Sequence, residues 1–253
     1  MPYSKNTSDL PHPNPPLTKG RVRKAMLFAA GRGERLKPLT DKTPKPLLPL
    51  GEKPIIDYSL FYLKSFGVEE VVINLWHLGE KIEQHCGNGS KYGLKINYSR
   101  EEKLLGTGGG LKKAESFFKS EEAFFTLNSD TLINCDLKEL ARFHEDRKMP
   151  ATVVVAPWRE PYTRLQVANN RFLNVGAGDY FFTGLTLLTP KIFEVLPPPE
   201  KPSNLILDGI LPLLQIVKGV SAFVLEGFWQ DIGTPENYQA AQEIWAASHA
   251  TRK

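Results

Sequence analysis

The sequence predicts an α/β protein: a three-layer α/β/α fold built on a Rossmann-like, mostly parallel mixed sheet. In the first half, short apolar segments alternate with amphipathic ones, which is typical of parallel strands covered by helices on both faces. In the second half, strand-like segments follow one another directly, which indicates antiparallel additions to that sheet. The chain has 253 residues, 41% of them apolar and 24% charged, and these values suit one large globular domain.

The expected elements of the first half follow from apolar periodicity and from residues that end helices. Gly67 is the predicted C-terminal cap of the first helix, and Asp136 is the predicted N-terminal cap of the fourth. The predicted strands are 24–30, 68–74, 94–99 and 122–128, and the predicted helices are 54–67, 77–86, 108–119 and 136–148.

The second half is expected to hold a hairpin that turns at Asn169 and Asn170, because asparagine tolerates the left-handed backbone of tight turns. Thr234 and Pro235 have the composition of a helix start. The predicted strands lie at 151–157, within 162–176, and at 179–189, 220–227 and 228–233; the predicted helices are 204–219, interrupted near Pro212, and 234–250.

Composition separates a tail from the rest of the chain. Residues 1–22 are proline-rich and hold almost no large apolar side chain, so we expect a disordered tail followed by one domain over 23–253. Residues 1–24 carry five basic side chains and one acidic one, which accounts for the whole net charge of +4. The remainder is neutral, which argues against a nucleic-acid partner.

No apolar run approaches the roughly 20 residues that a membrane-spanning helix needs, so no membrane association is expected. The start of the chain lacks the apolar core of a signal peptide, so a cytoplasmic location is expected. The two cysteines show no metal-binding spacing and are interpreted as reduced thiols.

The most informative stretch is the loop after the first strand, "AAGRGERLKPLTDKTPKPLLPL", residues 29–50. Gly31 and Gly33 allow backbone N–H groups to approach an anion, and Arg35 and Lys45 supply positive charge for phosphate oxygens. The loop lacks the Gly-Lys-Ser/Thr ending of a P-loop. It also has Leu36 where a dinucleotide fingerprint needs its third glycine, which argues against a Rossmann dehydrogenase.

Residues 27–50 resemble the signature of the sugar-1-phosphate nucleotidylyltransferases, L-x-A-A-G-x-G-x-R-x-x-P-L-T followed by P-K-P-L. The resemblance extends to "WQDIGTPENY" and so covers about residues 23–245. It implies a glycosyltransferase-A-like fold, with a nucleotide-binding half at 23–150 and a sugar-binding half at 151–253. The positions that fill the signature are Leu27, Ala29, Ala30, Gly31, Gly33, Arg35, Pro38, Leu39, Thr40, Pro44, Lys45, Pro46 and Leu47.

The family joins a nucleoside triphosphate to a sugar 1-phosphate and releases pyrophosphate. The resemblance implies that Arg35 stabilises the departing pyrophosphate and that Lys45 binds the α-phosphate or the sugar phosphate. It implies that Asp130 and Asp231 hold Mg²⁺ and that Thr183 and Gly184 line the sugar pocket. The implied nucleotide contacts are Ala29, Ala30, Gly31, Gly33, Glu34, Asn74, Glu102, Gly106, Thr107 and Gly108.

The substrates are left open between two readings. The triple glycine at 108–110 favours a uridylyltransferase that uses UTP and N-acetylmuramate 1-phosphate or a similar hexose 1-phosphate, a cell-envelope function. The alternative is a mannose-1-phosphate guanylyltransferase that uses GTP. A third reading from another class, a non-catalytic sugar-nucleotide sensor, predicts loss of Arg35, Lys45 or a metal-binding Asp, and all are present. A monomer or homodimer is expected.

Overall fold

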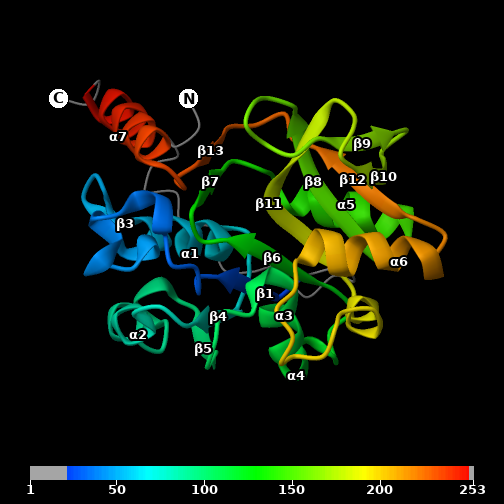
Figure 1. The fold of residues 1–253 in the computed structure, drawn as a ribbon, viewed down its shortest axis with the longest axis horizontal. Helices are drawn as coiled ribbons and strands as arrows, with labels where there is room; N and C mark the ends of the chain where they lie inside the picture. The colour runs from blue at the N-terminus through cyan, green and yellow to red at the C-terminus, as the bar shows by residue number, and fades with distance from the viewer. Residues whose placement is uncertain (1–21, 251–253) are drawn as a thin grey trace.

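A nine-stranded sheet forms the centre of the protein in the computed structural model, which describes residues 22–250 (Figure 1). The predicted tail therefore lies, apart from Val22, outside the described residues. The strand order is β5-β4-β1-β6-β11-β8-β12-β10-β9. The strands are β1 (Lys24–Phe28), β4 (Glu70–Leu75), β5 (Lys95–Arg100), β6 (Phe124–Asn128), β8 (Ala151–Pro157), β9 (Leu165–Ala168), β10 (Arg171–Val175), β11 (Tyr180–Leu188) and β12 (Val220–Val224).

The sheet is mixed, and its parallel part belongs to the first half of the chain. Strands β5, β4, β1 and β6 run parallel to one another. Strand β11 then pairs antiparallel with both β6 and β8, and β12 is parallel to β8. Because β1, β4 and β6 are parallel, their carboxyl ends meet at one edge, where a ligand site is expected in such sheets.

Helices cover both faces of the sheet, which confirms the three-layer prediction. Helices α1 (Ile55–Ser65), α2 (Gly79–Cys86) and α5 (Leu137–Arg147) pack on the face that holds Leu27 and Ile73. Helices α3 (Gly106–Lys113), α4 (Glu115–Phe118) and α6 (Leu211–Ile216) pack on the face that holds Met26 and Val72. Alternate residues of β1 and β4 are thus buried on opposite faces, as expected of central strands.

The local sequence signals mostly hold. The Asp136 carboxylate accepts hydrogen bonds from two backbone N–H groups at the start of α5, and Gly67 follows α1 with φ of 89°. Asn169 and Asn170 have φ of 51° and 57° and turn the β9–β10 hairpin. The helix predicted over 108–119 is instead two helices that meet at Ala114.

The helix predicted over 204–219 is a π-helix at Ile206–Ile210 that continues into α6. Pro212 is the second residue of α6, directly after the π-helix, so the continuous helix includes one residue that has no N–H to donate. The interruption predicted at Pro212 is therefore a change of helix type just before it. No helix within residues 22–250 is long and apolar enough to cross a membrane.

Outside the main sheet, two short strands bring distant parts of the chain together. Strand β7 (Thr131–Ile133) pairs antiparallel with β13 (Trp229–Asp231), and Figure 1 shows the two side by side next to the main sheet. Helix α7 (Pro235–Ala250) follows β13 and packs on a small core with the pair β2 (Pro49–Leu50) and β3 (Lys53–Pro54).

Candidate active site

The β7–β13 ladder places the two predicted metal-binding aspartates next to each other. Asp231 is opposite Thr131, and the Ile232 N–H donates to the Asp130 carbonyl at 2.9 Å. Strand β7 directly follows β6, so Asp130 stands at the carboxyl edge of the main sheet. A strand pairing thus joins residues that are about a hundred positions apart, which no local sequence pattern reveals.

Asp231 sits in a partly closed polar environment. Its Oδ2 accepts a hydrogen bond from the Asn237 amide at 2.9 Å and a longer one, 3.5 Å, from the Tyr162 hydroxyl. Burial raises the pKa of the Asp231 carboxyl, and the negative charge of Asp130 raises it further. The Asn237 hydrogen bond and the Lys45 charge oppose this rise. The two carboxylates repel each other, and a cation bound between them would remove this repulsion.

Both predicted cations face this pair of acids. The Lys45 ammonium is hydrogen-bonded to Asp130 Oδ2 in an ion pair of which both side chains are mostly buried. A Cβ at Gly233 would lie 2.8 Å from Arg35 Nη2 and 2.9 Å from Asp231 Oδ2, so the guanidinium and the carboxylate converge over this glycine. Gly233 is therefore a part of the site that the sequence analysis did not single out.

The donor set suits magnesium. Mg²⁺ prefers oxygen ligands and is usually held by one or two carboxylates together with substrate phosphates and water. Asp130 and Asp231 are two such carboxylates, and no cluster of three or more metal-ligating side chains was found in the part of the chain that the structure describes. The arrangement thus fits a metal shared with a phosphorylated substrate.

A buried polar network fastens the start of the predicted phosphate-binding loop, residues 29–50. Asn74, at the carboxyl edge of β4, accepts a hydrogen bond from the Ala29 N–H at 2.8 Å and donates to Glu101 Oε1 at 2.7 Å. The other oxygen of Glu101 accepts from the Leu105 N–H at 2.9 Å. Glu101 is buried, which raises its pKa, whereas the predicted nucleotide contact Glu102 is exposed. The buried acid of this network is therefore Glu101, and the contact of its neighbour Glu102 with the nucleotide stays a prediction.

The glycine-rich first half of α3 is held by the segment that precedes the π-helix. The Gly108 N–H donates to the Ser203 carbonyl at 2.9 Å, and Thr107 Oγ1 accepts from the Leu205 N–H at 3.0 Å. A Cβ at Gly108 would lie 2.7 Å from Ser203 Oγ, and one at Gly110 would lie 2.8 Å from Asn74 Nδ2. Close packing thus explains glycine at these positions, which removes the reason for taking the triple glycine as a mark of uridylyl transfer.

The predicted sugar-pocket residues lie on β11. The Thr183 hydroxyl is buried and donates to the Val154 carbonyl at 2.8 Å, so it is turned into the protein. Gly184 has φ of 89°, and a Cβ there would lie 2.8 Å from Asn128 Nδ2. Gly184 thus gives room to Asn128, a polar side chain two residues before Asp130 that the sequence analysis did not single out.

The remaining predicted nucleotide contacts lie along the loop. Ala29 and Ala30 are buried at the end of β1, and Gly31 is exposed. Gly33 has φ of 68° and accepts a hydrogen bond on its carbonyl from the Thr40 hydroxyl, which folds the loop back towards Lys45. Glu34 is exposed and forms ion pairs with two surface cations, Arg32 and Lys37. Its carboxylate is therefore directed to these cations and is not part of the pair of carboxylates formed by Asp130 and Asp231.

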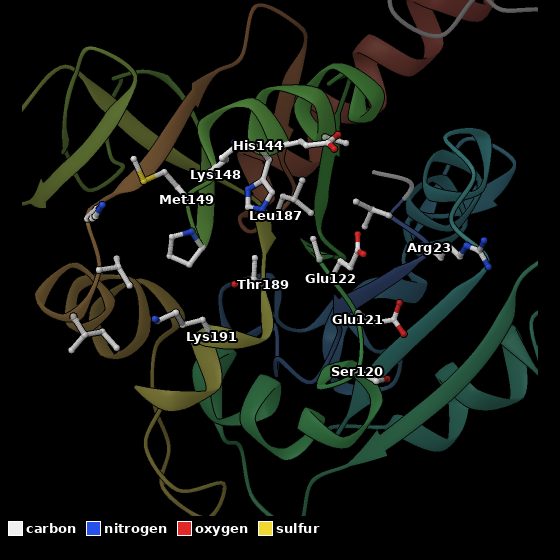
Figure 2. Close-up of a pocket in the computed structure, with 18 residues that line it drawn as sticks. Arg23, Ser120, Glu121, Glu122, His144, Lys148, Met149, Leu187, Thr189 and Lys191 are labelled. Atoms are coloured by element: carbon white, nitrogen blue, oxygen red, sulfur yellow. The ribbon is translucent and has the colours of Figure 1, made fainter. Parts of the chain in front are cut away.

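A cavity of about 800 Å³ lies at the opposite, amino edge of the sheet. It borders the residues just before β1, β6 and β12. Figure 2 shows Lys148 and Lys191 on one side, Glu121 and Glu122 on the other, and the His144 ring between them. No predicted site residue lines it, so it is separate from the candidate active site.

The comparison with protein families shows to which family the chain belongs. Residues 24–164, more than half of the chain, match the model of the nucleotidyl transferase family. The chain belongs to the nucleotidyl transferase family. The matched residues include the phosphate-binding loop, the Asn74–Glu101 network and Asp130, whereas Asp231 lies beyond them.

Relatives of this nucleotidyl transferase extend the likeness to the rest of the chain. It is 31% identical over 243 residues to a mannose-1-phosphate guanyltransferase of Saccharomyces cerevisiae, a match that spans 91% of this chain and 66% of the relative. It is 34% identical over 238 residues to a probable mannose-1-phosphate guanylyltransferase of Oryza sativa, spanning 89% of this chain and 65% of the relative. The chain thus spans slightly less than two thirds of the length of these relatives.

Solved structures share the fold. The nucleotidyl transferase chain superposes with a TM-score of 0.79 on a putative glucose-1-phosphate thymidylyltransferase from Bacillus anthracis, at 23% identity over 88% of this chain and 95% of that one. It superposes with a TM-score of 0.75 on HddC from Yersinia pseudotuberculosis complexed with GMP-PN, at 24% identity over 88% of this chain and all of that one. The predicted α/β nucleotidyltransferase fold is therefore confirmed.

Proposed function

We propose that this protein transfers a nucleotidyl group from a nucleoside triphosphate to a sugar 1-phosphate and releases pyrophosphate. The observation that carries the proposal is the convergence of Arg35, Lys45, Asp130 and Asp231, from three separate parts of the chain, at the carboxyl edge of the sheet. Two cations and two neighbouring carboxylates are the groups that a metal-bound triphosphate requires.

In the proposed reaction an oxygen of the sugar phosphate attacks the α-phosphorus of the nucleotide. The new bond joins that oxygen to the α-phosphorus, and the bond to the bridging oxygen breaks, so pyrophosphate leaves with the electron pair. Magnesium held by Asp130 and Asp231 would supply positive charge to the phosphate oxygens. No side-chain nucleophile is required, because the sugar phosphate is itself the nucleophile.

The cations have separate tasks in this scheme. Lys45 is paired with Asp130, and its mobile ammonium would bind the α-phosphate of the nucleotide. Arg35 lies over Gly233 and would bind the departing pyrophosphate through its fork of N–H donors. Asn74 and Glu101 hold the start of the loop in place, so the backbone N–H groups around Gly31 and Gly33 are preorganised for the triphosphate.

GTP and mannose 1-phosphate are the substrates that we favour. The relatives at 31% and 34% identity carry the names of mannose-1-phosphate guanylyltransferases. The uridylyl reading depended on the triple glycine, and the packing of Gly108 and Gly110 gives those residues another reason. The guanylyl alternative is therefore preferred to UTP and N-acetylmuramate 1-phosphate.

A pyrophosphate-release assay of the purified chain tests the proposal. It would combine each of four nucleoside triphosphates with the 1-phosphates of mannose, glucose, N-acetylglucosamine and N-acetylmuramate in the presence of Mg²⁺. We expect the highest kcat/KM with GTP and mannose 1-phosphate and no turnover after chelation with EDTA. Preference for UTP and N-acetylmuramate 1-phosphate would restore the uridylyl reading. Nucleotide binding without turnover of any pair would indicate the sugar-nucleotide sensor.

A further inference from the structure

A cluster of three aromatic rings, all from the second half of the chain, borders the pair of carboxylates formed by Asp130 and Asp231. Tyr162, from the β8–β9 loop, stacks on Phe181 with ring centroids 4.8 Å apart. Trp229, on β13, packs edge-on against both rings. The Tyr162 hydroxyl reaches Asp231 Oδ2, so the cluster is joined directly to the proposed metal site.

Arg159 lies over this cluster with its positive charge uncompensated. Its Cζ is 4.9 Å from the centroid of the Trp229 ring and 5.7 Å from that of Phe181. Its one hydrogen bond within residues 22–250, from Nη2 to the Trp229 carbonyl, is long at 3.4 Å. Arg159 forms no ion pair with any described residue, and its side chain is exposed. Most of its N–H donors therefore remain available to a ligand.

Strand geometry directs this guanidinium to the site. Trp229 and Asp231 are two residues apart on β13, so their side chains project from the same face of the strand. Arg159 over the Trp229 ring and the carboxylate of Asp231 therefore border the same space. The aromatic faces hold the cation in place by cation–π attraction without neutralising it.

We propose that Arg159 binds the phosphate group of the sugar 1-phosphate. This inference rests on the proposed function, which requires a second phosphate dianion beside the metal-bound triphosphate. The proposed scheme already uses Lys45 for the α-phosphate and Arg35 for the departing pyrophosphate, so neither is left for the sugar phosphate. Arg159 comes from the second half of the chain and lies over Trp229, two residues from Asp231, whereas Arg35 and Lys45 belong to the loop at 29–50. An arginine fork binds phosphate oxygens in pairs, which would also orient the attacking oxygen.

Arg164 in the same loop provides a matched control. Its guanidinium stacks on Trp158, with Cζ 3.4 Å from the ring centroid, and Nη1 donates to the Gly178 carbonyl at 2.8 Å. Arg164 thus has the same charge as Arg159 and lies in the same loop, but its guanidinium is bound to Trp158 and Gly178 within the protein. A general effect of removing positive charge from the loop should appear equally in both variants.

The test compares Arg159→Gln with Arg159→Lys and Arg164→Gln. Glutamine can keep a hydrogen bond to the Trp229 carbonyl but removes the charge. One charge-assisted phosphate contact is worth about 1.5–3 kcal/mol, so KM for the sugar 1-phosphate should rise roughly 10- to 150-fold in Arg159→Gln. KM for the nucleotide and the melting temperature should stay the same, Arg159→Lys should recover part of the affinity, and Arg164→Gln should leave KM for the sugar 1-phosphate unchanged.

Calorimetric titration of mannose 1-phosphate, in the presence of Mg²⁺ and a non-hydrolysable GTP analogue, separates this inference from the proposed function. Binding to the wild type that is weakened in Arg159→Gln supports the inference even without turnover, and that result would refute the proposed function alone. The inference is overturned if the wild type does not bind the sugar phosphate, if Arg159→Gln binds it normally, or if the KM values of both substrates rise together with a loss of stability.

Discussion

Each edge of the central sheet holds an ionisable group whose charged form is disfavoured by desolvation, but the two groups have different neighbours. At the carboxyl edge, Asp231 is half-buried near a second carboxylate, and its pKa is raised. At the amino edge, His144 lines a cavity, is buried, and shares a hydrogen bond with the Thr152 hydroxyl. Burial lowers the pKa of His144 to about 4, so this ring is neutral at physiological pH.

The difference lies in what surrounds each group. The acid pair is accompanied by the charges of Lys45 and Arg35 and by the amide of Asn237, which together favour ionised oxygens. Within residues 22–250, His144 shares its one side-chain hydrogen bond with the Thr152 hydroxyl, and burial keeps the ring uncharged. The carboxyl edge thus keeps charged side chains close together in a partly desolvated place, as expected of a catalytic site. At the amino edge, the buried His144 ring is neutral.

The largest effect should follow from removing a charge at the carboxyl edge. Asp130→Ala and Arg35→Ala should each lower kcat about 100- to 1000-fold, because each removes a group aimed at the phosphates. Steady-state pyrophosphate release measures the change. Asp136→Ala is the matched control, because it removes an aspartate away from the site. It should lose the N-terminal cap of α5 and about 1 kcal/mol of stability but retain turnover. Near-normal turnover in Asp130→Ala or Arg35→Ala would remove that residue from the proposed mechanism.

At the amino edge, acid should unfold the protein partly through His144. The ring binds a proton in the unfolded chain near pH 6.5 but in the folded protein only near pH 4, so its contribution is complete above pH 6.5 and is lost as the pH falls towards 4. The loss is on the order of 3 kcal/mol. Urea unfolding between pH 4 and 7 should show a shallower decline for His144→Leu, whereas parallel profiles would contradict a depressed pKa.

A smaller effect is expected in the glycine-rich first half of α3. Gly108→Ala would place a Cβ 2.7 Å from Ser203 Oγ, and such overpacking should lower the free energy of unfolding by about 1–3 kcal/mol. Chemical denaturation measures the change. In the double variant Gly108→Ala/Ser203→Gly, part of the loss should be recovered, because the hydroxyl no longer obstructs the methyl group. Equal destabilisation with and without Ser203 would show that the clash lies with the backbone instead.

The smallest effect should be a slight gain in thermal stability when the charge of Asp231 is removed. The raised pKa of Asp231 means that its ionised carboxyl disfavours folding at neutral pH, so Asp231→Asn should melt at a slightly higher temperature in EDTA while losing turnover. The gain should shrink as the pH falls and the wild-type carboxyl becomes protonated. A lower melting temperature would contradict this prediction. It would show that the hydrogen bonds from Asn237 and Tyr162 to the charged carboxylate stabilise the fold more than repulsion from Asp130 destabilises it.

Local chemistry allowed much of the fold to be predicted from the sequence. Apolar periodicity located the strands of the parallel half, and Asp136, Gly67 and the Asn169–Asn170 turn marked boundaries that the structure confirms. These features depend on residues within a few positions of one another, which a sequence displays directly. The phosphate-binding loop was equally visible, because its glycines, cations and prolines are contiguous.

Contacts between distant segments were decided only by the tertiary structure. Glu101 rather than Glu102 is the buried acid because the end of β5 turns that side chain towards Asn74, and a choice between adjacent glutamates depends on the face each presents. The meeting of Asp130 with Asp231 depends on the pairing of β7 and β13, whose residues are far apart in the chain. Sequence therefore determined which chemical groups are available, and the strand pairing determined which of them share a space.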